Sequence, residues 1–131
     1  MKKIISILNS IFNKETVFST RGATTVIEDS KNDIEIKTAR LLTELIKINN
    51  INKNDILFIV FSTTEDLKSY YPATVARMKL GLSTTALFST TEPAIKGSLK
   101  KCIRILLTYK TTSSKNKPHY IYQEEAKKLR I

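Results

Sequence analysis

Hydrophobic and polar positions follow two different periods along the chain, and together they predict a protein of mixed α and β structure. β-branched residues dominate residues 16–26, which predicts a first strand. Over residues 31–49, apolar side chains recur every three or four positions, which predicts a helix with one apolar face. Ser30, followed three residues later by Asp33, is typical of the N-terminal cap of such a helix.

The middle of the chain continues this alternation of strand and helix. A continuous apolar run over residues 56–61 predicts a buried central strand, and the polar residues 62–71 predict a loop. Pro72 suits the first turn of a second helix. We expect that helix to run to residue 80 and to end at Gly81, because glycine readily adopts a left-handed backbone.

Two further long strands are predicted over residues 84–90 and 99–109, with a polar turn at residues 110–117. Residues 120–122 favour a last short strand, and residues 123–129 favour a terminal helical turn. The order β-α-β-α-β-β predicts an α/β sandwich, in which helices cover one face of a single mixed sheet. The other face of such a sheet stays open, and oligomerisation is one way to cover it.

The length of 131 residues fits one domain, and 41% hydrophobic with 26% charged residues is an ordinary globular composition. We assign residues 16–131 to this domain and residues 1–15 to an N-terminal extension that we expect to be disordered or peripheral. The start of the extension imitates a signal peptide only faintly. No segment reaches the roughly 20 apolar residues of a membrane helix, so no membrane partner is expected.

Conventional catalytic signatures are absent from the sequence. Cys102 is the single cysteine and His119 the single histidine, so neither a disulfide within the chain nor a histidine-based metal site is predicted. Three glycines are too few for a glycine-rich phosphate loop. We therefore expect no metal, and an enzyme made from this chain would work mainly by positioning and electrostatics.

A net charge of +10 allows two interpretations. One is a surface for polyanions or small anionic substrates. The other is coding bias, because the chain is rich in Lys, Asn and Ile together. Tyr120 and Tyr122 could stack on bases in a basic nucleic-acid-binding module. However, the basic residues are scattered and no single-strand-binding motif is present, so we do not expect a nucleic-acid partner.

Two arginines occupy unusual places, since Arg21 lies in the first predicted strand and Arg104 in the fourth. An unpaired arginine in a buried strand is costly, so one alternative is an edge strand with the guanidinium in water. The other is that both arginines, with Arg77 of the second helix, converge on an anion. The planar guanidinium suits this role because it binds carboxylates through two parallel hydrogen bonds.

Four blocks of the chain resemble, in order and spacing, the trimeric α/β chorismate mutases of the Bacillus type. The blocks are residues 21–26 (RGATTV), 62–67 (STTEDL) with 71–77 (YPATVAR), 97–104 (GSLKKCIR), and 119–130. The resemblance implies three subunits around a pseudo-barrel core, with active sites in clefts between them. It implies the cofactor-free rearrangement of chorismate to prephenate in phenylalanine and tyrosine biosynthesis, in a bacterial cytoplasm or a plastid stroma.

The resemblance also implies roles for individual residues. Arg104 would lie beside the ether oxygen of chorismate, and Arg21 and Tyr122 would hold a carboxylate. Glu92 would accept a hydrogen bond from the ring hydroxyl; a solvated turn carboxylate is the alternative. The further substrate-binding residues implied are Arg77, Tyr71, Ala73, Ser89, Leu129 and Arg130.

Two positions depart from the family pattern. Ser89 stands where the best-known bacterial members have cysteine, and its hydroxyl can still donate and accept hydrogen bonds. Thr74 stands where some members have a basic residue, which weakens the positive wall of the cleft. An inactive trimeric relative that binds a small anion is the alternative function, since fold alone does not give function. A hydrophobic residue at position 104 would have favoured it, but the chain retains Arg104.

Overall fold

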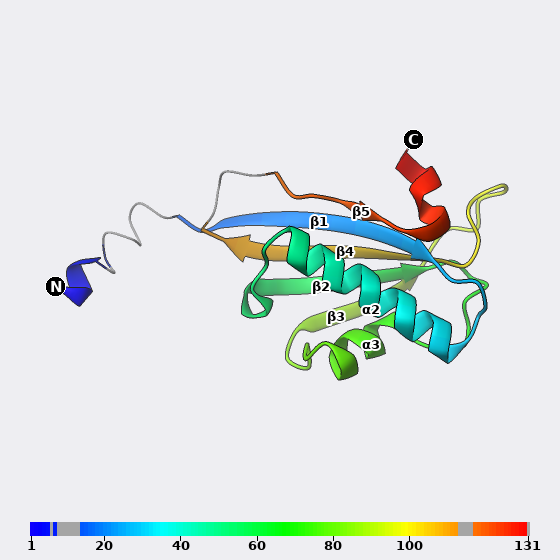
Figure 1. Ribbon diagram of the computed structural model, residues 1–131, viewed down its shortest axis with the longest axis horizontal. Helices are drawn as coiled ribbons and strands as arrows, with labels where there is room; N and C mark the ends of the chain where they lie inside the picture. The colour runs from blue at the N-terminus through cyan, green and yellow to red at the C-terminus, as the bar shows by residue number, and fades with distance from the viewer. Residues whose placement is uncertain (6, 8–13, 113–116, 131) are drawn as a thin grey trace.

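The computed structural model describes residues 1–5, 7, 14–112 and 117–130. In this part of the chain, five strands form one mixed sheet in the order β3-β2-β4-β1-β5 (Figure 1). The mixed sheet and its helices confirm the predicted α/β class. The elements are β1 (Thr16–Thr25), α2 (Lys31–Ile48), η1 (Lys53–Asp55), β2 (Ile56–Thr63), α3 (Pro72–Lys79), β3 (Ala86–Thr91), β4 (Cys102–Thr111), β5 (Ile121–Tyr122) and η2 (Glu124–Arg130), where η marks a 3-10 helix.

β4 lies in the centre of the sheet and pairs with two long strands. It runs antiparallel to β1 and to β2, while β3 is parallel to β2 and β5 is parallel to β1. The register places Arg104 of β4 between Ala23 of β1 and Ser62 of β2. Paired residues share a face of the sheet, so these three side chains point to the same side.

The core lies between the sheet and the helices α2 and α3, which cover one face (Figure 1). Its largest cluster joins α2 and α3 to the strands beneath them and includes Leu41, Leu42, Leu45, Ala76, Ile59, Phe61, Ile105 and Leu107. On the opposite face the buried hydrophobic residues of the described chain form a small cluster, where Ala126 of η2 packs on Ala23 and Cys102. Most of that face is therefore open, as predicted.

The N-terminus of α2 is capped as the sequence predicted, with one difference. The Ser30 hydroxyl accepts a hydrogen bond of 3.1 Å from the Asp33 N–H. The Asp33 carboxylate does not complete a reciprocal box; instead it accepts hydrogen bonds from the N–H groups of Ile27, at 2.7 Å, and Glu28. These bonds fix the turn between β1 and α2. The positive end of the helix dipole also stabilises a carboxylate at this position.

The fourth strand begins at Cys102, so the predicted start at residue 99 is wrong. Lys101 has a left-handed backbone, with φ of 50°, which ends any extended conformation before it. The Asp66 carboxylate accepts hydrogen bonds from the Lys101 N–H at 3.0 and 3.2 Å. The Thr64 hydroxyl accepts one from the Cys102 N–H at 2.9 Å. Contacts about 35 residues away along the chain therefore set where this strand starts.

Parts of two predicted segments lie outside the described residues: residues 6 and 8–13 of the N-terminal extension, and residues 113–116 of the turn before β5. Among the helices that the structure describes, none is long and apolar enough to cross a membrane.

Gly22 allows three elements to meet at β1. A Cβ at this position would lie 2.7 Å from the carbonyl oxygen of Ile121 in β5 and 3.0 Å from Leu41 of α2. Real Cβ atoms do not come this close to backbone atoms, so only glycine lets β5 and α2 pack against β1.

We predict that Gly22→Ala destabilises the protein by about 2–3 kcal/mol, because the backbone of β5 must move away. Gly97→Ala is the matched control, since a Cβ there meets no atom within 4 Å and only the left-handed φ of 80° is penalised, by about 1 kcal/mol. Urea unfolding at equal protein concentrations measures both losses. Equal losses in the two variants would contradict the close-packing explanation.

Candidate active site

A cavity of about 360 Å³ lies on the open face of the sheet, over β1, β4 and β2. Six residues predicted from the sequence line it together: Arg21, Glu92, Arg104, Tyr122, Leu129 and Arg130. Val60, Ser62 and Leu106 contribute to its floor. The volume is within the usual range for small-molecule sites, about 300–1,000 Å³.

Arg104 and Glu92 form an ion pair within this cavity. Arg104 Nε lies 3.6 Å from Glu92 Oε1, and the two side chains are 46% and 23% exposed. Glu92 is the first residue after β3, and its N–H donates a hydrogen bond of 2.8 Å to the Thr63 carbonyl. The end of β2 therefore fixes the backbone of Glu92. Nε is the atom of Arg104 that faces Glu92, and the guanidinium carries two further donor groups, its Nη atoms.

The C-terminal segment supplies a second cation to the cavity. Arg130 Nε donates a hydrogen bond of 3.0 Å to the Tyr122 hydroxyl. Its guanidinium carbon also lies 5.6 Å from the centre of the Tyr122 ring. Tyr122 is placed by β5, whose register pairs it with Ala23 of β1.

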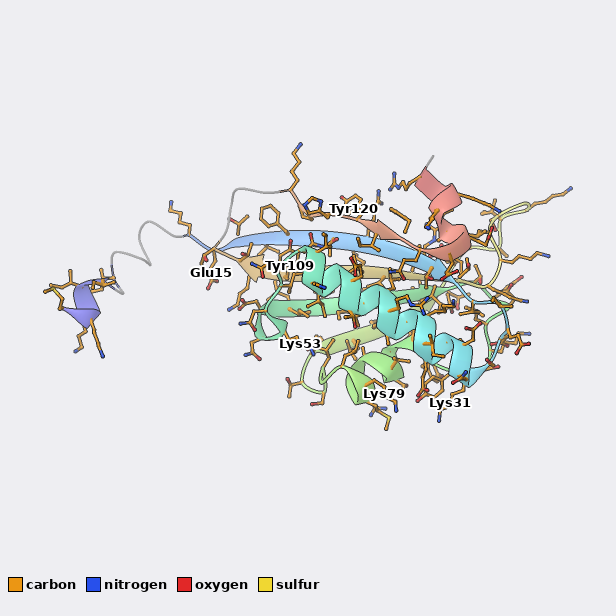
Figure 2. The ribbon with its side chains drawn as sticks, viewed as in Figure 1. Glu15, Lys31, Lys53, Lys79, Tyr109 and Tyr120 are labelled. Carbon is orange, nitrogen blue, oxygen red and sulfur yellow. The ribbon has the colours of Figure 1, made fainter. Side chains whose placement is uncertain are left out.

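Arg21 contacts an aromatic residue to which the sequence analysis gave no role in the site. Its guanidinium carbon lies 4.8 Å from the centre of the Tyr120 ring, a cation–π contact (Tyr120 is labelled in Figure 2). Tyr120 directly precedes β5, and Gly22 pairs with Ile121, so the register brings residues 21 and 120 side by side. Only this parallel pairing would have revealed the contact, because the two residues are far apart in the sequence.

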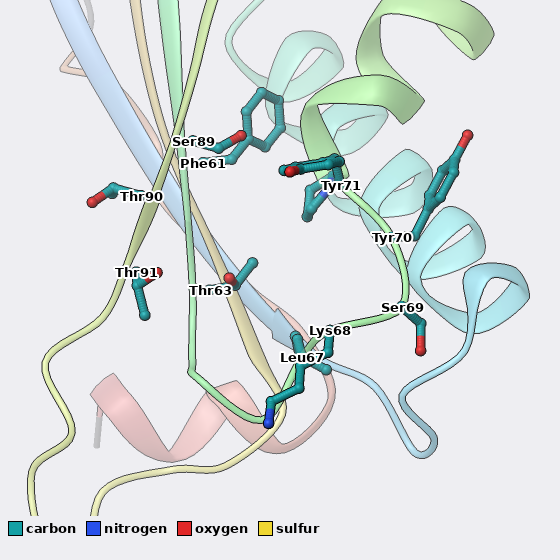
Figure 3. Close-up of a pocket in the computed structure, with 11 residues that line it drawn as sticks. Phe61, Thr63, Leu67, Lys68, Ser69, Tyr70, Tyr71, Ser89, Thr90 and Thr91 are labelled. Atoms are coloured by element: carbon teal, nitrogen blue, oxygen red, sulfur yellow. The ribbon is translucent and has the colours of Figure 1, made fainter.

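A second cavity, of about 540 Å³, lies on the helical face of the sheet, beside β2 and β3 (Figure 3). Tyr71 and Ser89, both predicted site residues, line this cavity and not the first one. Ser89 pairs with Phe61, which is buried beneath the helices, so its side chain faces the helical side of the sheet. The neighbouring Ser62 lines the first cavity, on the opposite face. The sheet therefore separates the two cavities within one chain.

The remaining two predicted residues lie on α3, outside the first cavity. Ala73 is partly buried against the core, and Arg77 is exposed. Neither of them is among the residues that line the two cavities described. The expected convergence of Arg77 with Arg21 and Arg104 is therefore not found within a single chain.

A carboxylate that the sequence analysis did not single out anchors the loop leading to Tyr71. Asp29 accepts hydrogen bonds of 3.0 Å from the N–H groups of Lys68 and Ser69 (Figure 3 shows both residues). Burial by itself would raise the pKa of Asp29, but these hydrogen bonds outweigh it and lower the pKa. The charged carboxylate is thus the form that holds the loop.

The charges of the first cavity favour an anionic ligand. Three guanidinium groups line it, those of Arg21, Arg104 and Arg130, against the single carboxylate of Glu92. Cys102 is buried beside it, and burial raises the pKa of its thiol, although the Arg104 guanidinium acts in the opposite direction. No group of His, Cys, Asp and Glu in the described part of the chain is arranged to hold a metal ion.

Together, the fold and the cavity define an α/β protein with a cavity rich in guanidinium groups on the open face of its sheet. The family model for chorismate mutase type I matches residues 17–131. The chain is 35% identical over 111 residues to chorismate mutase AroH of Thermus thermophilus, covering 84% of this chain and 90% of that protein. It is 34% identical over 110 residues to chorismate mutase AroH of Bacillus subtilis, covering 84% and 87%.

A solved structure of a chorismate mutase from Clostridium thermocellum agrees with these matches. It has a TM-score of 0.79 and 36% identity, and it covers 86% of this chain and 99% of its own. The chain therefore belongs to the chorismate mutase type I family. Membership confirms the predicted function: the protein is an isomerase, a chorismate mutase.

The contact between Arg21 and Tyr120 generates a test. We predict that Tyr120→Leu raises the KM for chorismate about two- to fivefold, because the stacked guanidinium loses its support. Tyr120→Phe keeps the ring and should retain the parent KM, and kcat should change little in either variant. Steady-state kinetics measures these values. A parent-like KM in Tyr120→Leu would show that the stacking does not position Arg21.

Proposed function

We propose that the cavity on the open face binds chorismate and provides the electrostatic part of catalysis. The observation that carries this proposal is the Arg104–Glu92 pair, which lies in one cavity with Arg21, Tyr122 and Arg130. Chorismate is a dicarboxylate with an ether oxygen and a ring hydroxyl. The cavity thus offers cations for carboxylates and the ether oxygen, and one carboxylate for a hydroxyl.

The reaction explains why no nucleophile or general base is needed. Within one molecule of chorismate, the ether C–O bond breaks while a new C–C bond forms, so no atom is gained or lost. The protein must hold the substrate in a compact conformer, which is a matter of positioning. It must also stabilise the negative charge that grows on the ether oxygen in the transition state.

We assign the second task to Arg104. Its Nε faces Glu92, so its Nη groups can donate hydrogen bonds to the ether oxygen. Glu92 also accepts a hydrogen bond from the ring hydroxyl in this proposal. Arg21 and Tyr122 bind a carboxylate, Arg130 adds positive potential, and Leu129 forms part of the apolar wall.

We further propose that the active form is a homotrimer and that each site is completed by a neighbouring subunit. Tyr71 and Ser89 line a cavity on the far side of the sheet, where they cannot contact a ligand of the first cavity in the same chain. The open face also exposes apolar side chains, including Phe88 at 67% and Leu106 at 40%. A second copy would cover this surface and bring Tyr71 and Ser89 to the site.

We place the catalytic domain at residues 16–131, and residues 1–15 outside it. In support, the family model begins to match at residue 17. The bacterial cytoplasm is the proposed location, rather than a plastid, because the two AroH relatives come from bacteria.

The role of Arg104 gives the first prediction of this proposal. Arg104→Ala is expected to lower kcat about 100- to 1000-fold, the usual cost of losing a well-placed oxyanion donor. Arg104→Lys should recover part of that loss, because an ammonium group can still approach the oxygen. Arg21→Ala should instead raise KM, because a carboxylate is already charged in the free substrate.

Absorbance assays of chorismate loss measure kcat and KM for these variants, with circular dichroism as the folding control. A folded Arg104→Ala protein with the parent kcat would overturn the electrostatic mechanism.

Shared sites give the second prediction, which uses mixed trimers. Arg104→Ala disables the first cavity, and Tyr71→Asp disables the second by placing a carboxylate near a dianionic substrate. Each variant alone should be inactive. When they are co-expressed, about a quarter of the sites combine two intact halves, so about a quarter of the parent activity should return.

The matched control mixes Arg104→Ala with Glu92→Ala, which alter the same cavity and should restore nothing. Sedimentation equilibrium should give about three times the 14.9 kDa chain mass for every sample. A monomeric parent protein, or no recovery in the first mixture, would refute the shared sites.

A further inference from the structure

The last segment of the chain leaves the sheet at the edge strand β5 and continues on the cavity face. After β5, the Gln123 N–H donates a hydrogen bond of 2.9 Å to the Ala23 carbonyl. Ala126 is then fully buried on the cavity face, against Ala23 and Cys102. Between them, the side chain of Glu124 reaches α2, which lies on the helical face (Figure 1 shows η2 beside β1 and β5). Glu124 is thus the residue that ties the start of this segment to the helical side of the sheet.

Two cations of α2 hold the Glu124 carboxylate. Its Oε1 accepts hydrogen bonds of 3.2 Å from Lys37 Nζ and 3.3 Å from Arg40 Nη1. The Lys37 side chain is only 12% exposed, whereas Glu124 is 38% and Arg40 54% exposed. A largely covered ammonium group needs an anionic partner, and Glu124 provides it. These pairs join positions that are 87 and 84 residues apart in the sequence.

The backbone of Glu124 shows that the direction of the segment is decided at this residue. Its φ is 53°, a left-handed conformation that residues with a Cβ adopt only at some cost. Asn and Asp often accept this conformation, but glutamate does so rarely. Surrounding contacts must therefore select it, and the ion pairs to α2 are the contacts that the Glu124 side chain makes.

The segment that begins at Glu124 carries two residues of the cavity wall, Leu129 and Arg130. Its remaining attachments are few. The Glu125 N–H donates a hydrogen bond of 3.2 Å to the Thr25 hydroxyl, and Arg130 contacts Tyr122. Ala126 is buried, and Leu129 packs against the same small cluster. A change in direction at Glu124 would therefore move Leu129 and Arg130 relative to the rest of the cavity.

We propose that Glu124 is a positioning residue for the active site, and that its ion pairs with Lys37 and Arg40 hold the C-terminal segment over the bound substrate. This inference rests on the proposed function of the cavity. Because the pairs are partly exposed, their contribution to overall stability is small. Their effect should appear in substrate binding, where Leu129 and Arg130 act, and hardly in kcat.

The test compares Glu124→Gln with Glu125→Gln. Both substitutions remove one negative charge from the same segment, but the ion pair of Glu125 within the described residues is a surface pair with its neighbour Lys128. By long-range attraction alone, either change should lower the KM for a dianionic substrate. We expect Glu124→Gln to raise KM about two- to tenfold, with kcat nearly unchanged, because the segment loses its anchor. Glu125→Gln should not raise KM.

Two further measurements separate positioning from a general loss of structure. Amide hydrogen exchange of the peptide 123–130 should become faster in Glu124→Gln and stay near the parent rate in Glu125→Gln. Lys37→Gln should raise KM in the same direction, and the double variant Glu124→Gln/Lys37→Gln should add little, because both changes break one interaction.

Unchanged exchange together with an unchanged KM in Glu124→Gln would overturn the inference, and so would faster exchange without a rise in KM. Failure of the proposed function is distinguishable, because a folded Arg104→Ala protein would then keep the parent kcat, while the exchange experiment would still report the anchoring of the segment.

Discussion

Each side chain of β4 faces one of two environments, because β4 lies between β1 and β2 and its residues alternate between the faces of the sheet. Ile103, Ile105 and Leu107 fill the core under the helices. Arg104, between two of them in sequence, must point to the open face. The two strands on either side continue this division through their register, so the core and the cavity are two sides of one sheet. Burial that stabilises the fold therefore also orients the arginine.

The surroundings of Arg104 explain how a charged group is tolerated at the centre of a sheet. Its side chain is about half exposed and lies near the Glu92 carboxylate, so neither charge is buried without a partner. An ion pair of this exposure contributes little to folding. Its importance is geometric, since Glu92 limits how the guanidinium can rotate. A cation fixed before the substrate arrives costs little reorganisation during the reaction, which is what electrostatic catalysis requires.

Local patterns predicted the parts of the fold that local forces determine. The apolar period and the cap at Ser30 gave α2 to within a residue or two, and the unusual arginines in strands pointed to the cavity. The predicted start of β4 was wrong because Asp66, far away in the sequence, holds the turn at Lys101 that precedes the strand. Tyr120 was missed for the same kind of reason, since its contact with Arg21 depends on the pairing of β5 with β1. Likewise, only the register between β2 and β3 shows that Ser89 faces away from Arg104.

A reaction that needs no proton transfer and no covalent intermediate depends on how accurately the protein positions the groups that contact the substrate. Under the proposed mechanism, the groups that meet chorismate come from strands and from irregular segments, and the strands need no further support. Three irregular segments of the described chain are each held by a carboxylate. Asp29 holds the loop that leads to Tyr71, Asp66 fixes the turn before β4, and Glu124 ties the last segment to α2. Each carboxylate binds N–H groups or cations of a distant part of the chain, so the tertiary fold itself determines where these segments lie.

Glu124 differs from the other two because its partners are side chains and not backbone N–H groups. Side-chain ion pairs are weakened by salt and by motion more readily than backbone hydrogen bonds, so this anchor is the one whose loss the rest of the fold would survive.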